Sequence, residues 1–559
     1  MVIKGTGANA FRAAYAAFAR EFAPETLPRL RPLNTLATQH AQERLAASLR
    51  HAGYNSPVTV HGKQAAAFLD ECVSLLREEM SQSLSFTAPI ETVAYFIAQN
   101  EALGWAFDHG YSFLSRRLSV AKDLAALETT VDGEWRLMST SSIACRYLIE
   151  VCAARPPQGT KPPNGKQYDC LLALAHLVVE YGARGDAYRL KLSPLEVTFD
   201  GASSVSCETP AYMEALRKSS RERATARCVL WSTVPTSNLH YSPQLQVTQD
   251  KLDREYDLAF EMRFGFTPKE HATILGEIQN VGDTLEGPAK VMNMDTLRAH
   301  LTLTAGLRAS AVTHFFDEMG LAQRPEDLGP AASSRATGVN PWRFARERSF
   351  LRRPLVLLGQ APSRLVMWGN LNLMHGMLCF GEECTEQRYR FQGTPLEAAI
   401  GRMVNAAGKE FMMEVKAEVL KRTHLRAPHG LKRFSRVPMA DDSGHFLGDI
   451  DVLAVNESCK RIALIECKRF SSAAAPHEVR RELDELNKTL SKQEARTRWL
   501  LAHQDIVAAE LGLESVDSWD IQALVVTSDP TVAANLVKSS IPIMSFLTFA
   551  NAWLPTWAE

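Results

Sequence analysis

The chain has 559 residues, of which 46% are hydrophobic and 22% are charged, and its formal net charge is -1 at pH 7. This composition is that of a folded globular protein of two or three domains, and it excludes a disordered or fibrous chain. A net charge near zero provides no overall field that attracts nucleic acid, so any nucleic-acid-binding surface has to be local.

The sequence gives no sign of export or of membrane insertion. The first residues, Met1-Val2-Ile3-Lys4-Gly5, lack the apolar core of a signal peptide and lead into a helical pattern at residues 8–21. The longest apolar run, near Leu171–Val179, is far too short to span a bilayer. We therefore expect a cytoplasmic protein without a membrane partner.

Residues 1–320 are predicted to be mostly helical. Apolar residues recur there at helical spacing, and the predicted helices cover residues 36–52, 63–81, 89–118, 168–183, 210–227 and 251–318. Thr267-Pro268-Lys269-Glu270 is a predicted helix start, and Gly320 is a predicted helix end. Leu195–Phe199 is predicted as a lone strand.

A loop at residues 155–167 divides this region into two candidate subdomains. It nearly matches a phosphate-binding loop, but five rather than four residues separate Gly159 from Gly165, and Gln167 stands where Ser or Thr is required. Its prolines also prevent a nest of backbone amides. We therefore reject a nucleotide site and assign residues 1–320 to regulation, substrate selection, or binding of a protein partner or a second copy of the chain.

Residues 321–341 are rich in Pro, Gly and Ser and are predicted to be a linker to a C-terminal domain at residues 342–559. An accessory β-hairpin is predicted at residues 354–368. A capped helix follows from Thr394-Pro395 and carries Glu410 and Glu414, which are neighbours on its surface.

The segment after this helix is strongly basic. Because Lys and Arg on loops contact phosphate oxygens rather than base edges, we expect it to position a nucleic-acid backbone. Its candidate contacts are Lys421, Arg422, Arg426, Lys432, Arg433 and Arg436, and Lys492, on a helix later in the chain, is a further candidate contact to nucleic acid. The basic run at residues 217–227 is interpreted as a solvated helix face.

Two apolar strands, Gly448–Val455 and Arg461–Lys468, are predicted to form a β-hairpin. If the turn is centred between residues 458 and 459, Asp451 lies opposite Glu466. Asp449 then lies opposite Lys468. Since side chains alternate between faces, all four charged side chains would project from one face at one end of the hairpin.

Two adjacent carboxylates repel each other, and a divalent cation between them relieves that repulsion. Oxygen ligands suit Mg²⁺ or Mn²⁺ better than zinc. The ammonium of Lys468 would lie beside the ion and orient a water molecule or balance phosphate charge. The pattern predicts metal-assisted hydrolysis of a phosphodiester, against the alternative of a structural ion pair between Asp449 and Lys468.

A helix beginning near His477 and strands at residues 520–527 and 541–546 complete the C-terminal domain. Asp451 with Glu466-Cys467-Lys468 resembles the PD-(D/E)XK signature of restriction-endonuclease-like nucleases, and Gly448–Ala454 is similar to the Mrr- and NERD-like branches. The resemblance covers about the last third of the chain. It implies an αβββαβ core with a mixed sheet, and the predicted order of helix, β-hairpin, helix and strand agrees with that core.

The resemblance also implies roles for single residues. Asp451 and Glu466 would bind the metal together with the main-chain carbonyl of Cys467, and Lys468 would assist the attacking water. Relatives carry a further glutamate where this chain has Met412, so Glu414, Glu410 or Asp449 are candidates for the outer ligand. The resemblance further implies a polar or basic residue on the following helix, for which the candidates are Gln493 and Lys492.

We therefore expect an α+β protein with a helical N-terminal region and a C-terminal nuclease domain that cleaves double-stranded DNA in bacterial defence. Two alternatives stay open. One is a degenerate nuclease fold that binds nucleic acid or a partner without cutting it, which the replacement by Met412 favours. The other is an RNase, because the motif does not discriminate between the sugars.

Overall fold

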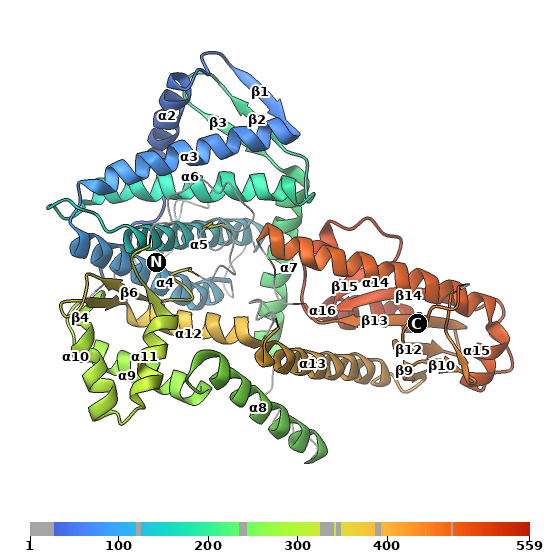
Figure 1. The fold of residues 1–559 in the computed structure, drawn as a ribbon. Coiled ribbons are helices and arrows are strands. Elements are labelled where there is room, and N and C mark those ends of the chain that lie inside the picture. The colour runs from blue at the N-terminus through green and yellow to red at the C-terminus, as the bar shows by residue number, and fades with distance from the viewer. Residues whose placement is uncertain are drawn as a thin grey trace. The chain divides into compact units, whose positions relative to one another are not determined.

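A computed structural model of the chain describes residues 27–118, 124–233, 243–324, 340–342, 348–385, 393–441, 443–470, 473 and 475–559 (Figure 1). The helix predicted at residues 8–21 and most of the linker predicted at residues 321–341 lie outside the described residues. None of the described helices is long and apolar enough to cross a membrane.

The chain divides into two compact units that do not follow the predicted domain order. The first unit comprises Met1–Tyr188, Leu195–Glu208 and Val247–Ile400, and the second comprises Arg189–Pro194, Thr209–Gln246 and Gly401–Glu559. Residues 209–246, which the sequence analysis assigned to the N-terminal region, thus belong to the same unit as the candidate catalytic hairpin. The two units are described separately below.

The first unit is mostly helical, as predicted. Its helices are α2 (Thr35–His51), α3 (Gly62–Ser85), α4 (Pro89–Leu118), α5 (Leu124–Ala154), α6 (Gly165–Arg189), most of α8 (Pro243–Phe264), α9 (Pro268–Asp283), α10 (Met294–Ala299), the π-helical turn η1 (His300–Thr304), α11 (Ala309–Met319) and α12 (Asn370–Thr385). The predicted helices at residues 36–52, 63–81, 89–118 and 168–183 are confirmed.

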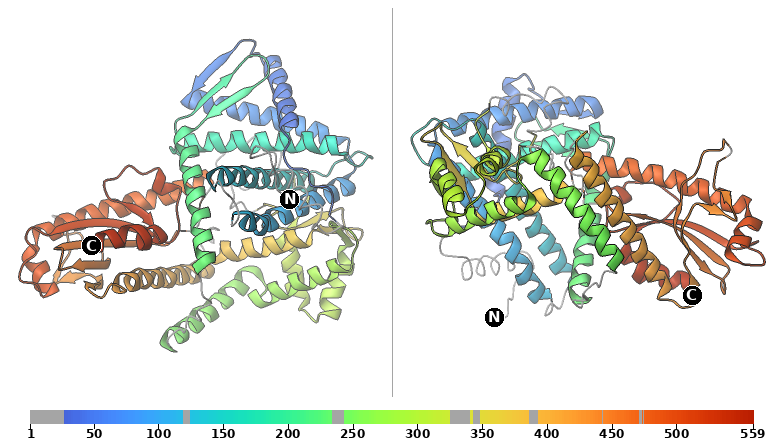
Figure 2. Two further views of the ribbon diagram at one scale, coloured as in Figure 1. Left: turned by 180° about the vertical axis from the view of Figure 1, so that it is seen from behind. Right: turned by 60° about the horizontal axis from the view of Figure 1, so that its bottom comes forward.

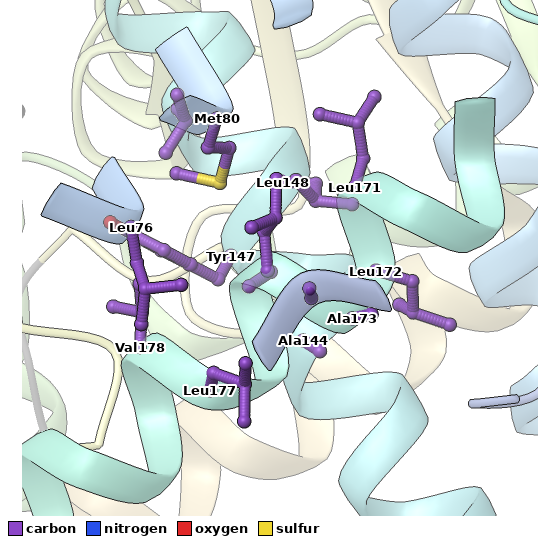
Figure 3. Close-up of a cluster of buried hydrophobic side chains, with 14 of the residues drawn as sticks. Leu76, Met80, Ala144, Tyr147, Leu148, Leu171, Leu172, Ala173, Leu177 and Val178 are labelled. Atoms are coloured by element: carbon purple, nitrogen blue, oxygen red, sulfur yellow. The ribbon is translucent and has the colours of Figure 1, made fainter. Parts of the chain in front are cut away.

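Helix α6 lies at the centre of this unit because it is apolar on almost all sides. Figure 3 shows its Leu171 to Val178 segment packed against side chains of α3 and α5, including Leu76 and Leu148. Each of these side chains is almost fully removed from solvent. Burial of each leucine contributes roughly 1.5–3 kcal/mol, so this layer of three helices contributes substantially to the unit's stability.

Two small sheets complete the first unit. The strands β1 (Val58–His61), β2 (Glu196–Phe199) and β3 (Val205–Glu208) form an antiparallel sheet, so the strand predicted to stand alone has a partner on each side. The second sheet has the order β4-β7-β6-β5, with β4 (Lys290–Asn293), β5 (Gly320–Leu321), β6 (Leu355–Leu358) and β7 (Leu365–Trp368).

The hairpin predicted at residues 354–368 is formed by β6 and β7. It pairs on one side with β4 and on the other with β5, so it lies in the first unit and not with residues 401–559. Its place after the predicted linker favoured the C-terminal domain, whereas backbone hydrogen bonds to β4 and β5 decide its position.

The helix start predicted at Thr267–Glu270 is confirmed by a capping box, in which the Thr267 and Glu270 side chains each bind the other residue's backbone amide. The first turn of this helix carries His271, which is 7% exposed and stacks on Phe266. Phe260, Phe315 and Phe380 also contact it. Its Nε2 atom is buried and has no hydrogen-bond partner among the described residues.

Burial lowers the pKa of His271 from its ordinary value of 6.5 to about 4. Below pH 6.5 the unfolded chain therefore binds a proton that the folded chain excludes, so stability falls as the pH drops from 6.5 towards 4. We expect this histidine to cost about 2 kcal/mol between pH 7 and pH 5. A His271→Phe variant should lose that part of the pH dependence of the free energy of unfolding, measured with urea. The control is His314→Gln, which changes an exposed histidine and should retain it. If the free energy of unfolding depends on pH in the same way in His271→Phe and in the wild type, His271 is not its source.

The second unit contains a six-stranded mixed sheet and flanking helices. The sheet has the order β15-β14-β13-β12-β8, with β9 also paired to β12. The strands of the unit are β8 (Leu425–Arg426), β9 (His429–Leu431), β10 (Arg433–Phe434), β11 (Val437–Pro438), β12 (Ile450–Asn456), β13 (Arg461–Lys468), β14 (Asp520–Thr527) and β15 (Ile543–Ser545). Strands β12 and β13 are antiparallel, while β13, β14 and β15 are parallel. The four predicted strands are thus present, and the α+β fold class with a mixed sheet is confirmed.

The helices of the second unit are α7 (Pro210–Thr233), most of α13 (Pro395–Leu420), α14 (Pro476–Ala502), α15 (Gln504–Leu511), η4 (Ala533–Asn535), α16 (Phe546–Thr548), η5 (Phe549–Trp553) and α17 (Leu554–Ala558). Both views of Figure 2 show the sheet between α13 and α14. One face packs on α13 through residues such as Val452 and Ile465, and the other packs on α14 through Leu453 and Leu464.

Candidate active site

The observed register of the hairpin β12–β13 is the predicted one. Val452 pairs with Ile465, and Asn456 pairs with Arg461. One step beyond the paired residues, this register sets Asp451 opposite Glu466. The alternation of side chains along strands of Val, Leu and Ile therefore brings two carboxylates together at one end of the sheet.

The face on which these carboxylates lie follows from the packing. Leu453 and Leu464 pack towards α14, so Asp451, Glu466 and Lys468 project from the same face of the sheet. Contacts of Glu466 and Lys468 with side chains of α14 agree with this. The side chain of Cys467 points the other way and packs with the core beneath α13.

Asp451 is a partly buried carboxylate with one engaged oxygen. Its Oδ2 accepts a hydrogen bond of 2.8 Å from the backbone amide of Cys467. Its Oδ1 accepts none from the described residues. Burial, followed by the repulsion of Glu466, raises the pKa of Asp451 from 3.8 to about 6. The folded chain therefore holds a carboxylate whose negative charge is poorly compensated.

Glu466 is 7% exposed and lies between two cations. Its Oε2 accepts from Nη1 of Arg496 at 2.5 Å, and its Oε1 lies 3.2 Å from Nζ of Lys468. Lys468 also lies 3.4 Å from Oε1 of Glu485. Although burial opposes the charge of Lys468, Glu466 and Glu485 raise its pKa, so its ammonium stays protonated beside the two acids.

The candidate outer ligands are not gathered around this pair. Within the residues that the structure describes, no three His, Cys, Asp or Glu side chains come close enough to hold a metal ion. Asp449, Glu410 and Glu414 are exposed. Burial and then Glu410 raise the pKa of Glu414, while Arg469, the residue after Lys468, opposes the rise. Helix α13 packs on the face of the sheet opposite to the one that carries Asp451 and Glu466.

The two candidates on α14 have different environments. Lys492 is exposed. Gln493 is buried, and its Nε2 donates to the carbonyls of Leu464 and Leu524 at 3.3 Å each. Gln493 thus binds two strands of the sheet. Its Oε1 accepts at 3.2 Å from Nη1 of Arg496, the same atom that donates to Glu466.

Sequence reasoning missed Arg496 and Glu485 as members of the site. Arg496 follows Lys488 and Lys492 at intervals of four residues along α14, a spacing typical of a solvated basic face, but it is 3% exposed, whereas the two lysines face solvent. The available signal was its place one turn before the apolar pair Trp499 and Leu500, which marks the buried face of α14.

The basic segment after α13 separates into two groups. Lys421 and Arg422 pair with Glu418, and Arg426 pairs with Glu457 and donates to the Leu511 carbonyl. In contrast, Lys432, Arg433 and Arg436 are exposed, and within the described part of the chain their side chains make no hydrogen bond or ion pair. We call these three residues the free basic group.

The free basic group is joined to the site through β9. Leu431 of β9 pairs with Ile450 of β12, so the next residue, Lys432, lies beside Asp449. Arg433 begins the small hairpin β10–β11, whose two-residue turn consists of Ser435 and Arg436, both with positive φ. The free basic group therefore starts at the end of β12 that carries the acids.

The donor set fits a hard divalent cation. Magnesium in phosphate-processing sites is held by one or two carboxylates, with water and substrate oxygens as the remaining ligands. Asp451 and Glu466 provide that number, Oδ1 of Asp451 is available, and the backbone of Cys467 runs alongside Asp451. Burial and the repulsion of Glu466 raise the pKa of Asp451 although Lys468 opposes the rise, so a further cation bound at this point would favour the ionised carboxylate.

A protein-family model described as "Anti-phage protein Upx-like" matches residues 1–548. The match extends over both compact units. No curated protein and no solved structure matches the chain.

Proposed function

The chain belongs to the Upx-like family of anti-phage proteins, and we propose that it defends the cell as a metal-dependent nuclease that cleaves double-stranded DNA. The family description agrees with the expected role in defence. The nuclease proposal rests on one observation, the pairing of Asp451 and Glu466 on neighbouring strands with the Lys468 ammonium 3.2 Å from Glu466.

In this proposal Asp451 and Glu466 hold Mg²⁺ or Mn²⁺, with the carbonyl of Cys467 as a further ligand. The bound ion would lower the pKa of a water molecule and stabilise charge on the phosphate. Lys468 supplies a fixed positive charge on the same face, where it orients the attacking water and balances the developing negative charge. The order α13, β8 and β9, β12, β13, α14, β14 agrees with the αβββαβ core that the PD-(D/E)XK resemblance implies.

A binding function without cleavage is the second candidate. It is favoured by Glu466, whose two oxygens are both occupied by side-chain cations, and by Met412 at the position of the usual glutamate. A site that neutralises itself in this way can persist after catalysis is lost.

The test is a cleavage assay with the full-length protein. Supercoiled plasmid, linear double-stranded DNA and single-stranded RNA are each incubated with Mg²⁺, Mn²⁺ or EDTA. We expect metal-dependent cutting of both DNA substrates and none in EDTA. Cutting of RNA alone would replace the proposal with an RNase, and retention of DNA without cutting would favour the binding function.

We further propose that the free basic group contacts the phosphate backbone. Changing Lys432, Arg433 and Arg436 to alanine should weaken DNA binding for all sequences alike. The slope of log K against log salt should become shallower by about 0.9 for each phosphate that the variant no longer neutralises. Fluorescence anisotropy at several salt concentrations measures both effects.

The matched control is the double change Lys421→Ala and Arg422→Ala, which removes cations already paired with Glu418. We expect its salt slope to stay close to that of the wild type. Equal effects in the two variants would show that the distinction between free and paired cations does not govern binding.

A further inference from the structure

The ion pair between Arg496 and Glu466 is the most buried charge contact at the candidate site. Nη1 of Arg496 lies 2.5 Å from Oε2 of Glu466, and the side chains are 4% and 9% exposed. A buried ion pair stabilises a fold only if its remaining hydrogen-bonding groups are satisfied. The contacts of Arg496 therefore show whether its position is fixed.

Arg496 is fixed from two further directions. Its Nε donates to the carbonyl of Leu447 at 3.0 Å, and its Nη1 also donates to Oε1 of Gln493 at 3.2 Å. Gln493 is itself held by the carbonyls of β13 and β14. Hydrogen bonds thus link the guanidinium to Glu466 of the sheet, to Gln493 of α14 and to Leu447 in the segment before β12.

The backbone leaves room for this guanidinium. Gly448 has a φ of +83°, and a Cβ atom there would lie 2.8 Å from Nη2 of Arg496. Only glycine adopts this left-handed conformation without strain and also leaves that space open. Gly448 therefore leaves room for the guanidinium in this position.

The position of Arg496 has a consequence for metal binding. Glu466 has two oxygens, of which one is held by Arg496 and the other lies beside Lys468. A divalent ion that uses Glu466 must therefore share or displace one of these cations. The contact with Arg496 is the shorter of the two, at 2.5 Å against 3.2 Å for Lys468. Because hydrogen bonds between charged groups are strong, a metal ion at Oε2 has to replace a strongly bound partner.

We infer that Arg496 is a positioning residue that neutralises Glu466 in the metal-free protein and competes with the metal for Oε2. The inference rests on the proposed function of Asp451 and Glu466 as metal ligands. The contact between Arg496 and Glu466 makes the site stable without metal and lowers the affinity of the site for the ion. Metal binding then requires Oε2 to exchange one cation for another.

The test compares Arg496→Met with Arg498→Met, an exposed arginine on the same helix. Melting temperature is measured in EDTA and at increasing Mg²⁺, and Mn²⁺ binding is measured by calorimetry. We expect Arg496→Met to melt lower in EDTA, to gain more from metal than the wild type, and to bind Mn²⁺ about tenfold more tightly. Arg498→Met should match the wild type in all three measurements.

Weaker or unchanged Mn²⁺ binding by Arg496→Met would overturn the inference, because removal of a competitor cannot weaken binding of the ion. If Arg496→Met does not fold, Arg496→Lys takes its place. A lysine keeps the charge, but its single nitrogen replaces two separate donor atoms, Nε that binds Leu447 and Nη1 that binds Gln493 and Glu466. Its hold on Glu466 is therefore weaker, so tighter Mn²⁺ binding is again expected and unchanged or weaker binding again overturns the inference.

Asp451→Asn separates this failure from failure of the proposed function. A metal-dependent stabilisation that is present in the wild type and absent from Asp451→Asn establishes the metal site independently of Arg496. If the wild type itself shows no metal-dependent stabilisation, the proposed metal site fails, and the inference about Arg496 fails with it.

Discussion

An Asp451→Asn variant is expected to lose at least about a thousandfold in DNA cleavage, equivalent to about 4 kcal/mol of activation free energy. The amide keeps the shape of the carboxylate and can still accept from the backbone amide of Cys467. It removes the negative charge that would hold the ion. Loss of activity in this variant therefore reports on metal binding rather than on folding.

The stability of the same variant provides a second, independent readout. Burial and the repulsion of Glu466 raise the pKa of Asp451, so its ionised form costs stability at pH 7 in the metal-free protein. We expect Asp451→Asn to melt at the same or a higher temperature than the wild type in EDTA. Low activity together with a low melting temperature would indicate a structural defect instead.

The control for this experiment is Asp520→Asn on β14. Asp520 also lies on a strand of the sheet, but it pairs with Arg461 at the opposite end of β13 from Glu466. Cleavage and phage protection should both survive this change. Cleavage by Asp451→Asn at the rate of the Asp520→Asn protein would exclude Asp451 from catalysis.

The site could be predicted as far as local chain geometry determines it. The turn centre between residues 458 and 459 and the alternation of Val, Leu and Ile were enough to set Asp451 opposite Glu466. Arg496 could not be placed in this way, because its partner lies on a strand 30 residues earlier. Its charge favoured a solvated position, and only tertiary packing decides otherwise.

The same limit applies to the domain organisation. Helix α7 was assigned to the N-terminal region by continuity, yet its Ser219 donates to the carbonyl of Pro530 at 3.4 Å within the second unit. The hairpin β6–β7 was assigned to the C-terminal domain for the same reason. Both positions are set by contacts between segments far apart in the sequence, which periodicity and turn residues do not encode.

Gly159 was considered in the sequence as part of a near match to a phosphate-binding loop, and the structure gives it another role. Its amide donates to the carbonyl of Thr87 at 2.9 Å, so this amide is not free to bind phosphate. A Cβ atom at this position would lie 2.0 Å from both the carbonyl carbon and the oxygen of Phe86. Because the obstructing atoms belong to the backbone, rotation of a side chain cannot relieve the clash.

A Gly159→Ala variant is therefore expected to be about 2–4 kcal/mol less stable than the wild type in urea unfolding. The matched control is Gly276→Ala in α9, where a Cβ atom would meet no atom of the described residues within 4 Å. That change should raise stability by about 0.5–1 kcal/mol, because alanine is the better helix former. A fold that accepts Gly159→Ala without loss would show that the contact between the loop and Phe86 is not a fixed part of the first unit. The opposite signs expected of the two substitutions follow from the surroundings of each glycine, since both replace glycine by the same residue: a backbone clash decides the effect at Gly159, and helix propensity decides it at Gly276.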